Sequence, residues 1–176
     1  AVLEGSLGAL RGNVQLDAGN LAFRNRAITD ASLSARLEWP RIDIEKLRFD
    51  DPLGAIEAVG QAEWTGETQR FELTSLRATR EGSELLLDRP ASVVLGPNKV
   101  DVGPFELSGS AGSATVGYHE DPLARGLSVH LDGFDSQVLL GPWLPVDWSA
   151  GRLDGRLVAD LMGENPIIDL DLTAKG

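Results

Sequence analysis

The sequence predicts an all-β protein built from one elongated antiparallel sheet that curls like a half-pipe around a hydrophobic groove. Three observations predict it: apolar residues recur two positions apart, turn residues follow at short intervals, and glycines punctuate the runs. Residues 151–161 are the clearest case, reading Gly-x-Leu-x-Gly-x-Leu-x-Ala-x-Leu. Alternation of this kind is typical of strands with one apolar and one polar face.

The first part of the chain divides into short apolar runs that end at turn residues. Pro40 ends one run, and the pair Asp51-Pro52 ends another. Proline lacks an N–H donor, and aspartate and asparagine tolerate the backbone angles of turns. We therefore expect a turn at residues 17–20 and strands at residues 14–16, 21–23, 33–39, 42–44, 47–49 and 62–64.

The same pattern continues through the rest of the chain. A hairpin is expected where Gly96-Pro97-Asn98 joins two alternating runs. Residues 105–118 are predicted to form one strand, in which glycine, alanine and serine leave few large side chains and the sheet would bend. The strands expected in this part are residues 71–78, 85–87, 93–95, 100–102, 105–118, 127–131, 151–161 and 168–172.

One segment departs from the period of two. Phe134, Val138 and Leu139 fall at helical spacing, and Asp135 or Ser136 could cap a first turn. The spacing predicts one short helix over residues 134–140, ending before Gly141-Pro142 and covering an open end of the sheet.

Composition excludes several classes of protein. The formal net charge is −11, with 27 acidic against 16 basic residues, which argues against nucleic acid as a partner. The absence of cysteine excludes disulfides and thiolate metal sites. Leucine occurs 27 times against 12 valines and 6 isoleucines, an unusual preference for strands and a hint of a deformable, lipid-facing surface.

The sequence shows no recognisable set of catalytic residues. His119-Glu120-Asp121 is the best metal or acid–base candidate, but adjacent side chains in a turn rarely converge on one ion. His130 alternates with valine and leucine, so it is expected on the solvent face. We expect no enzyme, no catalytic residue, no metal and no cofactor. The four tryptophans could form a sugar-stacking platform or a rim where apolar surface meets water.

A series of landmarks runs from residue 88 to residue 176. It begins with the hairpin at residues 91–102, Phe105-Glu-Leu-x-Gly, the strand at 127–131 and the helical turn before Leu144-Pro145. Gly151-Arg-Leu-Asp-Gly, Asn165-Pro166 and Ile168-x-Leu-x-Leu follow. In this order the landmarks resemble the C-terminal region of the TamB family of translocation and assembly module proteins.

The resemblance implies a β-taco-like fold and a role in biogenesis of the outer membrane. It implies a periplasmic location in a diderm bacterium, with the full-length protein anchored in the inner membrane and an outer-membrane barrel protein of the TamA type as partner. The cargo would be phospholipid or unfolded outer-membrane protein. Because the chain opens at Ala1 in strand sequence, we interpret residues 1–176 as a single β-rich segment of a longer periplasmic protein.

The groove would shield acyl chains or alternating β-segments from water. The alternation predicts the residues that line it: Leu33, Leu37, Ile42, Ile44, Phe71, Leu73, Phe105, Leu107, Leu127, Val129, Leu131, Leu153, Leu157, Leu161, Leu170 and Leu172. A one-residue error in any strand would reverse its assignment. Two other functions stay open: a carbohydrate-binding or adhesin-like β-sandwich, and a lipopolysaccharide-bridge domain.

Overall fold

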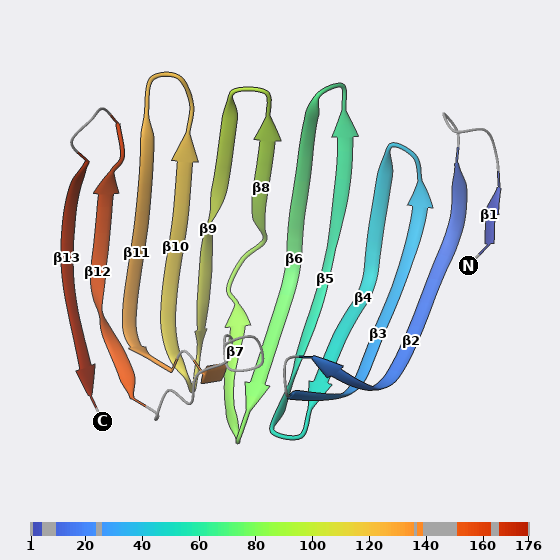
Figure 1. Cartoon of the computed structure of the whole chain (residues 1–176), viewed down its shortest axis with the longest axis horizontal. Helices are drawn as coiled ribbons and strands as arrows, with labels where there is room; N and C mark the ends of the chain where they lie inside the picture. Colours follow the sequence, from blue (N-terminus) through green and yellow to red (C-terminus); the bar gives the residue numbers. More distant parts are fainter. Residues whose placement is uncertain are drawn as a thin grey trace.

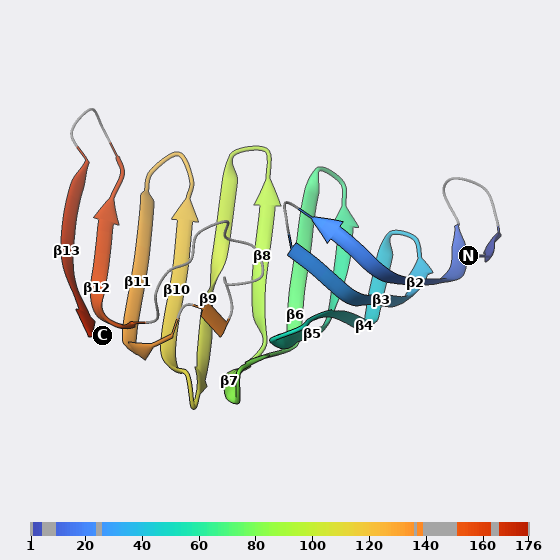
Figure 2. The same cartoon turned by 60° about the horizontal axis from the view of Figure 1, so that its bottom comes forward.

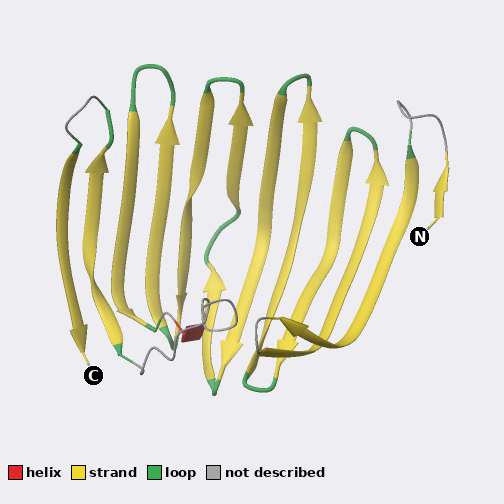
Figure 3. Ribbon diagram, in the orientation of Figure 1, coloured by secondary structure: helices red, strands yellow, loops and turns green. Residues whose placement is uncertain are grey.

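A computed structural model describes residues 2–4, 10–23, 26–135, 137–138, 151–162 and 166–175. Its strands form one antiparallel sheet, laid out in Figure 1 from β1 at one edge to β13 at the other. Nearly all of the described chain is strand or short turn (Figure 3). The predicted all-β curled antiparallel sheet is confirmed.

The strand bounds are β1 Val2–Glu4, β2 Arg11–Phe23, β3 Arg26–Glu38, β4 Arg41–Asp51, β5 Gly54–Thr65, β6 Thr68–Arg80, β7 Ser83–Leu87, β8 Ala91–Gly96, β9 Lys99–Gly109, β10 Gly112–Glu120, β11 Arg125–Phe134, β12 Arg152–Asp160 and β13 Ile167–Lys175. Each strand pairs with the next in sequence, except that β7 and β8 do not pair with each other. β7 and β8 lie in one row, because both pair with β6 on one side and β9 on the other.

The sheet curls because its ladders are interrupted. Register shifts occur between β3 and β4, β4 and β5, β5 and β6, β9 and β10, and β11 and β12. Each bulge bends the strand and increases its twist. Figure 2 also shows β2 and β3 bending out of the plane of the sheet toward the end of their hairpin, where the ladder between them has no register shift.

Strand register separates the side chains into two faces. Residues paired across a ladder share a face, and neighbours along a strand alternate. On β5 and β6 one face carries Ile56, Ala62 and Trp64 against Ala78 and Phe71. The other face carries glutamate, glutamine, serine, threonine and arginine on the same strands. We call these the apolar face and the polar face, and the register extends both from β2 to β13.

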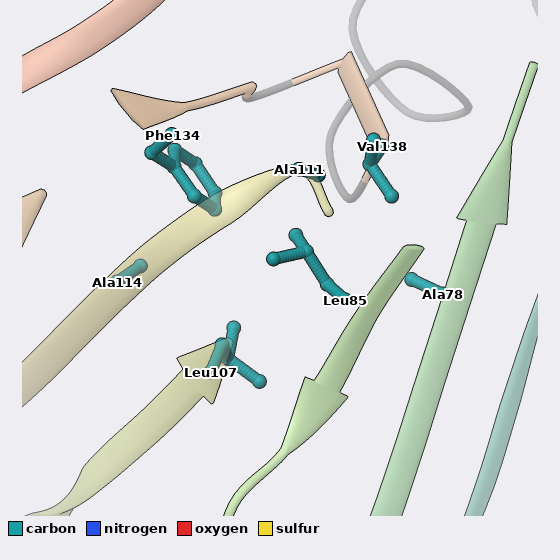
Figure 4. Packing of buried hydrophobic residues seen from close by; sticks show 7 residues of the cluster. All are labelled: Ala78, Leu85, Leu107, Ala111, Ala114, Phe134 and Val138. Atoms are coloured by element: carbon teal, nitrogen blue, oxygen red, sulfur yellow. The ribbon is translucent and has the colours of Figure 1, made fainter. Parts of the chain in front are cut away.

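The buried core lies on the apolar face, at one end of the strands. Its members are Ala78, Leu85, Leu107, Ala111, Ala114, Phe134 and Val138. Figure 4 shows Leu85 at the centre of this cluster, with Val138 and Phe134 beside Ala111. The Asp135 N–H donates to the Ala111 carbonyl at 2.7 Å, which holds the segment after β11 against the sheet.

Three expectations about the strands were wrong. The expected turn at residues 17–20 lies inside β2, and the two runs expected at 42–44 and 47–49 are one strand with a bulge between them. The thin strand expected at 105–118 is two strands, β9 and β10, joined by a tight turn at Ser110 and Ala111. Turn residues are tolerated inside long strands, and small residues fit equally well into a strand or a tight turn.

The expected helix at 134–140 is corrected at its beginning. Phe134 is the last residue of β11 and pairs with Leu153, so the strand extends where helical spacing was read. Asp135 is neither strand nor helix, Gln137 and Val138 are helical, and residues 136, 139 and 140 lie outside the described residues. The expected hairpin at 96–98 is present, with Gly96 paired to Lys99. In the part of the chain that the structure describes, no helix has the length and apolarity to cross a membrane.

Candidate functional site: the apolar face

The apolar face is almost free of charge. Among its paired strand residues with described side chains, the charged ones are Asp51 and Arg80 at one end of the strands, and Glu120 and Arg125 at the other. Each pair forms an ion pair beside a turn. The middle of the face is therefore lined by leucine, isoleucine, valine, phenylalanine, alanine and glycine.

The residues predicted to line a groove fall together on this face. The register places every one of them there except Leu161: Leu33, Leu37, Ile42, Ile44, Phe71, Leu73, Phe105, Leu107, Leu127, Val129, Leu131, Leu153, Leu157, Leu170 and Leu172. Leu161 follows directly after β12, where its N–H donates to the Arg125 carbonyl at 2.8 Å. A binding role for these residues stays a prediction.

Within the described parts of the chain, no second layer covers most of this face. The chain exposes 11092 Å², whereas a compact monomer of 18.8 kDa exposes about 8,300 Å². Sheets normally bury one face against helices or another sheet. On β13 the uncovered leucines are more than half exposed, Leu170 by 60% and Leu172 by 54%. The apolar face is thus an accessible surface with room for a ligand.

An ion pair marks one edge of the apolar face. Arg80 Nη1 lies 3.0 Å from Asp51 Oδ2, with side chains 9% and 13% exposed. Asp51 also accepts the N–H groups of Leu53 and Gly54 through Oδ1, which fixes the turn between β4 and β5. The Arg80 Nε is buried and meets no acceptor among the described residues. Breaking this pair would leave a charge in an apolar setting, which is costly.

A second polar group marks the opposite edge. The Tyr118 hydroxyl donates to Glu120 at 2.5 Å, and Arg125 forms an ion pair with the same carboxylate. The hydrogen bonds from Tyr118 and Arg125 lower the pKa of Glu120, and the bond to Glu120 raises the pKa of Tyr118. Charge and hydrogen-bonding capacity are therefore concentrated at the margins of the face.

Aromatic side chains gather at the same margin, at the ends of β3 to β6. Trp39 and Trp64 stack with ring centroids 5.4 Å apart, and Phe71 meets Trp64 edge-on at 6.1 Å. The backbone N–H of Trp39 donates to the Leu10 carbonyl, and the backbone N–H of Trp64 donates to the Pro40 carbonyl. Sequence reasoning placed these tryptophans at strand ends but could not pair them, because the contact depends on register. Trp143 and Trp148 lie outside the described residues.

The polar face carries ion pairs, some along one strand and some between neighbouring strands. Arg48 contacts Asp50 at 2.6 Å and Glu57 at 2.5 Å. Lys175 lies 2.7 Å from Asp154, and this contact raises the pKa of Lys175 and lowers that of Asp154. Such pairs on exposed surfaces stabilise a fold only weakly, but they keep the face hydrated. The polar face is therefore the solvent side of the sheet.

His119 belongs to this polar face and does not assemble a site with Glu120. Its Nε2 lies 2.9 Å from Asp121 and its Nδ1 lies 3.4 Å from Asp101. Hydrogen bonds to Asp121 and then Asp101 raise the pKa of His119. Glu120 points to the apolar face, as alternation requires. No group of three or more potential metal ligands occurs within the described residues.

His130 is exposed and lies on the polar face, opposite Arg156 across the β11–β12 ladder.

The comparisons with known proteins add nothing to this geometry, since the chain matches no protein-family model, no curated protein and no solved structure.

Proposed function

We propose that this chain is a non-enzymatic module of envelope biogenesis, whose apolar face shields lipid acyl chains from water while they move between membranes. The observation that carries the proposal is an apolar face that runs from β2 to β13, is charged only at its edges and, outside the buried cluster, is left uncovered by the described residues. Each 100 Å² of apolar surface that a chain covers contributes about 2.5 kcal/mol.

The same surface supports transport better than storage. The face continues from strand to strand, and its apolar side chains bind an acyl chain without directional bonds. A ligand could therefore slide along it without a deep minimum. The periplasmic location, the inner-membrane anchor and a TamA-like partner rest on the sequence resemblance and stay predictions.

A second cargo is favoured by the edge strand β13. Within the described residues β13 pairs with β12 alone, over nine residues with no register shift. Long, regular, apolar edge strands pair readily with other strands. An alternating β-segment of an outer-membrane protein could add to this edge by β-augmentation.

The other functions left open by the sequence find less support. A carbohydrate-binding β-sandwich needs two packed sheets, whereas the described strands form one. A lipopolysaccharide-bridge domain would use the same apolar face with a different lipid, and only identification of the bound lipid separates it from the proposed module.

The proposal is tested by a charge placed on either face of one strand. Val129 and Leu157 are partners on the apolar face, and His130 is the neighbour of Val129 on the polar face. We expect Val129→Asp and Leu157→Asp to lose lipid that co-purifies with the wild type, and His130→Asp to retain it. Native mass spectrometry measures the bound lipid, and circular dichroism checks that each variant keeps its strands. If all three variants carry lipid as the wild type does, the apolar face is not the carrier.

A further inference from the structure

The two edges of the apolar face differ. At the edge formed by the turns at residues 52–53, 81–82 and 110–111, the cluster around Leu85 and Val138 fills the space over the sheet. These two are the largest side chains that are fully buried in the described chain. At the opposite edge, formed by the turns at 39–40, 66–67, 97–98 and 122–123, the large apolar side chains are half-buried or exposed. We call these two rows of strand ends the closed edge and the open edge, as distinct from the edge strands β1 and β13.

The open edge has the chemistry of a boundary between apolar surface and water. Trp39, 42% exposed, stacks on Trp64, and Trp64 continues into Phe71 on the apolar face. An indole combines a large apolar ring with one N–H donor and is suited to such a boundary. Further along the same edge Glu120 and Arg125 supply charges that are only partly buried.

The uncharged middle of the face restricts the ligand. A charged peptide laid across it would bury its charges without partners, at a high cost. A molecule with one polar end and a long apolar chain would place its polar end at the open edge and its chain on the uncharged surface. This distribution of charge fits a lipid better than a polypeptide.

The depth of the open part fits one acyl chain. Half of a bilayer's hydrocarbon core is about 15 Å thick, and a strand rises about 3.3 Å per residue, so one chain spans about five residues. On β6 the apolar face outside the cluster runs over five residues, from Gln69 to Leu73, because the next residue on that face, Leu76, already packs against the cluster. Beyond Leu73 the face continues to Ala78, which is fully buried under the cluster at the closed edge.

We propose that a diacyl lipid binds with its headgroup at the open edge, its glycerol–ester region against the Trp39–Trp64 pair, and its acyl chains directed toward the closed edge. This inference rests on the proposed function and adds to it the direction of the lipid and the residues that contact its polar neck. The tryptophans supply the reporter that tests it.

The test uses tryptophan quenching by bromine, which acts at short range. The protein carries Trp143→Phe and Trp148→Phe, so that Trp39 and Trp64 remain, and is loaded from phosphatidylcholine vesicles brominated at acyl carbons 6 and 7 or at carbons 11 and 12. We expect the bromines near the headgroup to cause the larger loss of fluorescence. In a second protein, Trp39→Phe and Trp64→Phe are added, and Phe105→Trp places the reporter at mid-strand on the apolar face. At this position the lipid brominated at carbons 11 and 12 should cause the larger loss of fluorescence.

Each outcome decides a separate question. Equal quenching by the two lipids at the Trp39–Trp64 pair, or stronger quenching by the deep bromines, overturns the proposed direction and leaves lipid binding intact. Quenching in neither protein, together with no lipid in the mass spectrum, overturns the proposed function as well. Because Trp39, Trp64 and Phe105 belong to the proposed binding face, native mass spectrometry measures the lipid bound by each reporter protein, and quenching is compared at equal lipid occupancy.

Discussion

Removing the Leu85 side chain should destabilise the protein far more than removing that of its neighbour Leu86. Leu85 is 0% exposed at the centre of the core cluster, while Leu86 is 42% exposed on the polar face. Leucine-to-alanine changes in filled cores cost about 2–5 kcal/mol, because the transfer free energy is lost and a cavity remains. Exposed substitutions away from special contacts stay within about 0.5 kcal/mol.

For Leu85→Ala we expect a loss at the upper part of that range. The cavity would be bounded by Ala78, Ala111 and Val138, and two of these are alanines with no side chain to move into the space. Domains are stable by only about 5–15 kcal/mol, so the urea midpoint should fall clearly. Leu86→Ala is the matched control and should leave the midpoint nearly unchanged.

Urea unfolding followed by circular dichroism measures both variants, and amide hydrogen exchange locates the effect. Because each strand makes its main contacts with its neighbours in the sheet, faster exchange in Leu85→Ala should concentrate in β6, β7, β9 and β10 and fade toward β13. Equal losses of stability for the two variants, or a larger loss for Leu86→Ala, would refute the assignment of faces and of the core.

Two further predictions concern charged groups. Asp121 and Asp101 raise the pKa of His119 in the folded protein, so the stabilisation from protonated His119 is complete below about pH 6.5 and is lost as the pH rises through the folded-state pKa. The pKa of Asp121 is lowered, so its stabilisation is present above about pH 3.9 and is lost as the pH falls through its folded-state pKa. An NMR titration should give a midpoint for His119 above 6.5 that falls in Asp121→Asn; an unchanged midpoint would contradict the contact. Asp51→Asn leaves Arg80 buried without its counter-ion and should cost about 3–5 kcal/mol in urea unfolding. Glu84→Gln, at an exposed pair, should cost no more than about 1 kcal/mol, and equal costs would argue against a buried pair.

Alternation alone identified which side chains share a face. Successive side chains of a strand point to opposite faces, so Val129 and Leu131 must lie on the face opposite His130 whatever the strand pairs with. Local patterns were weaker at boundaries. The turn at Ser110 and Ala111 was read as strand, and Phe134 was read as helix, because small residues and a spacing of four fit more than one backbone conformation.

Contacts between distant segments could not be predicted in this way. The Trp39–Trp64 stack and the Arg80–Asp51 pair join residues 25 and 29 positions apart, since 64 − 39 = 25 and 80 − 51 = 29. Both depend on the register of β4 to β6, and a bulge in β4 and another at the β5–β6 ladder set that register. A pattern of apolar and polar residues records no such shift.

The sequence by itself determined a sheet with one apolar face nearly free of charge and one charged, polar face, because the period of two and the types of residue are local properties. The tertiary structure decided which edge of the apolar face is closed and which is open. That difference arises where Phe134 and Val138 fold back onto Leu85 and Ala111, and where bulges bring Trp39 onto Trp64. Such contacts are fixed by how the whole sheet curls.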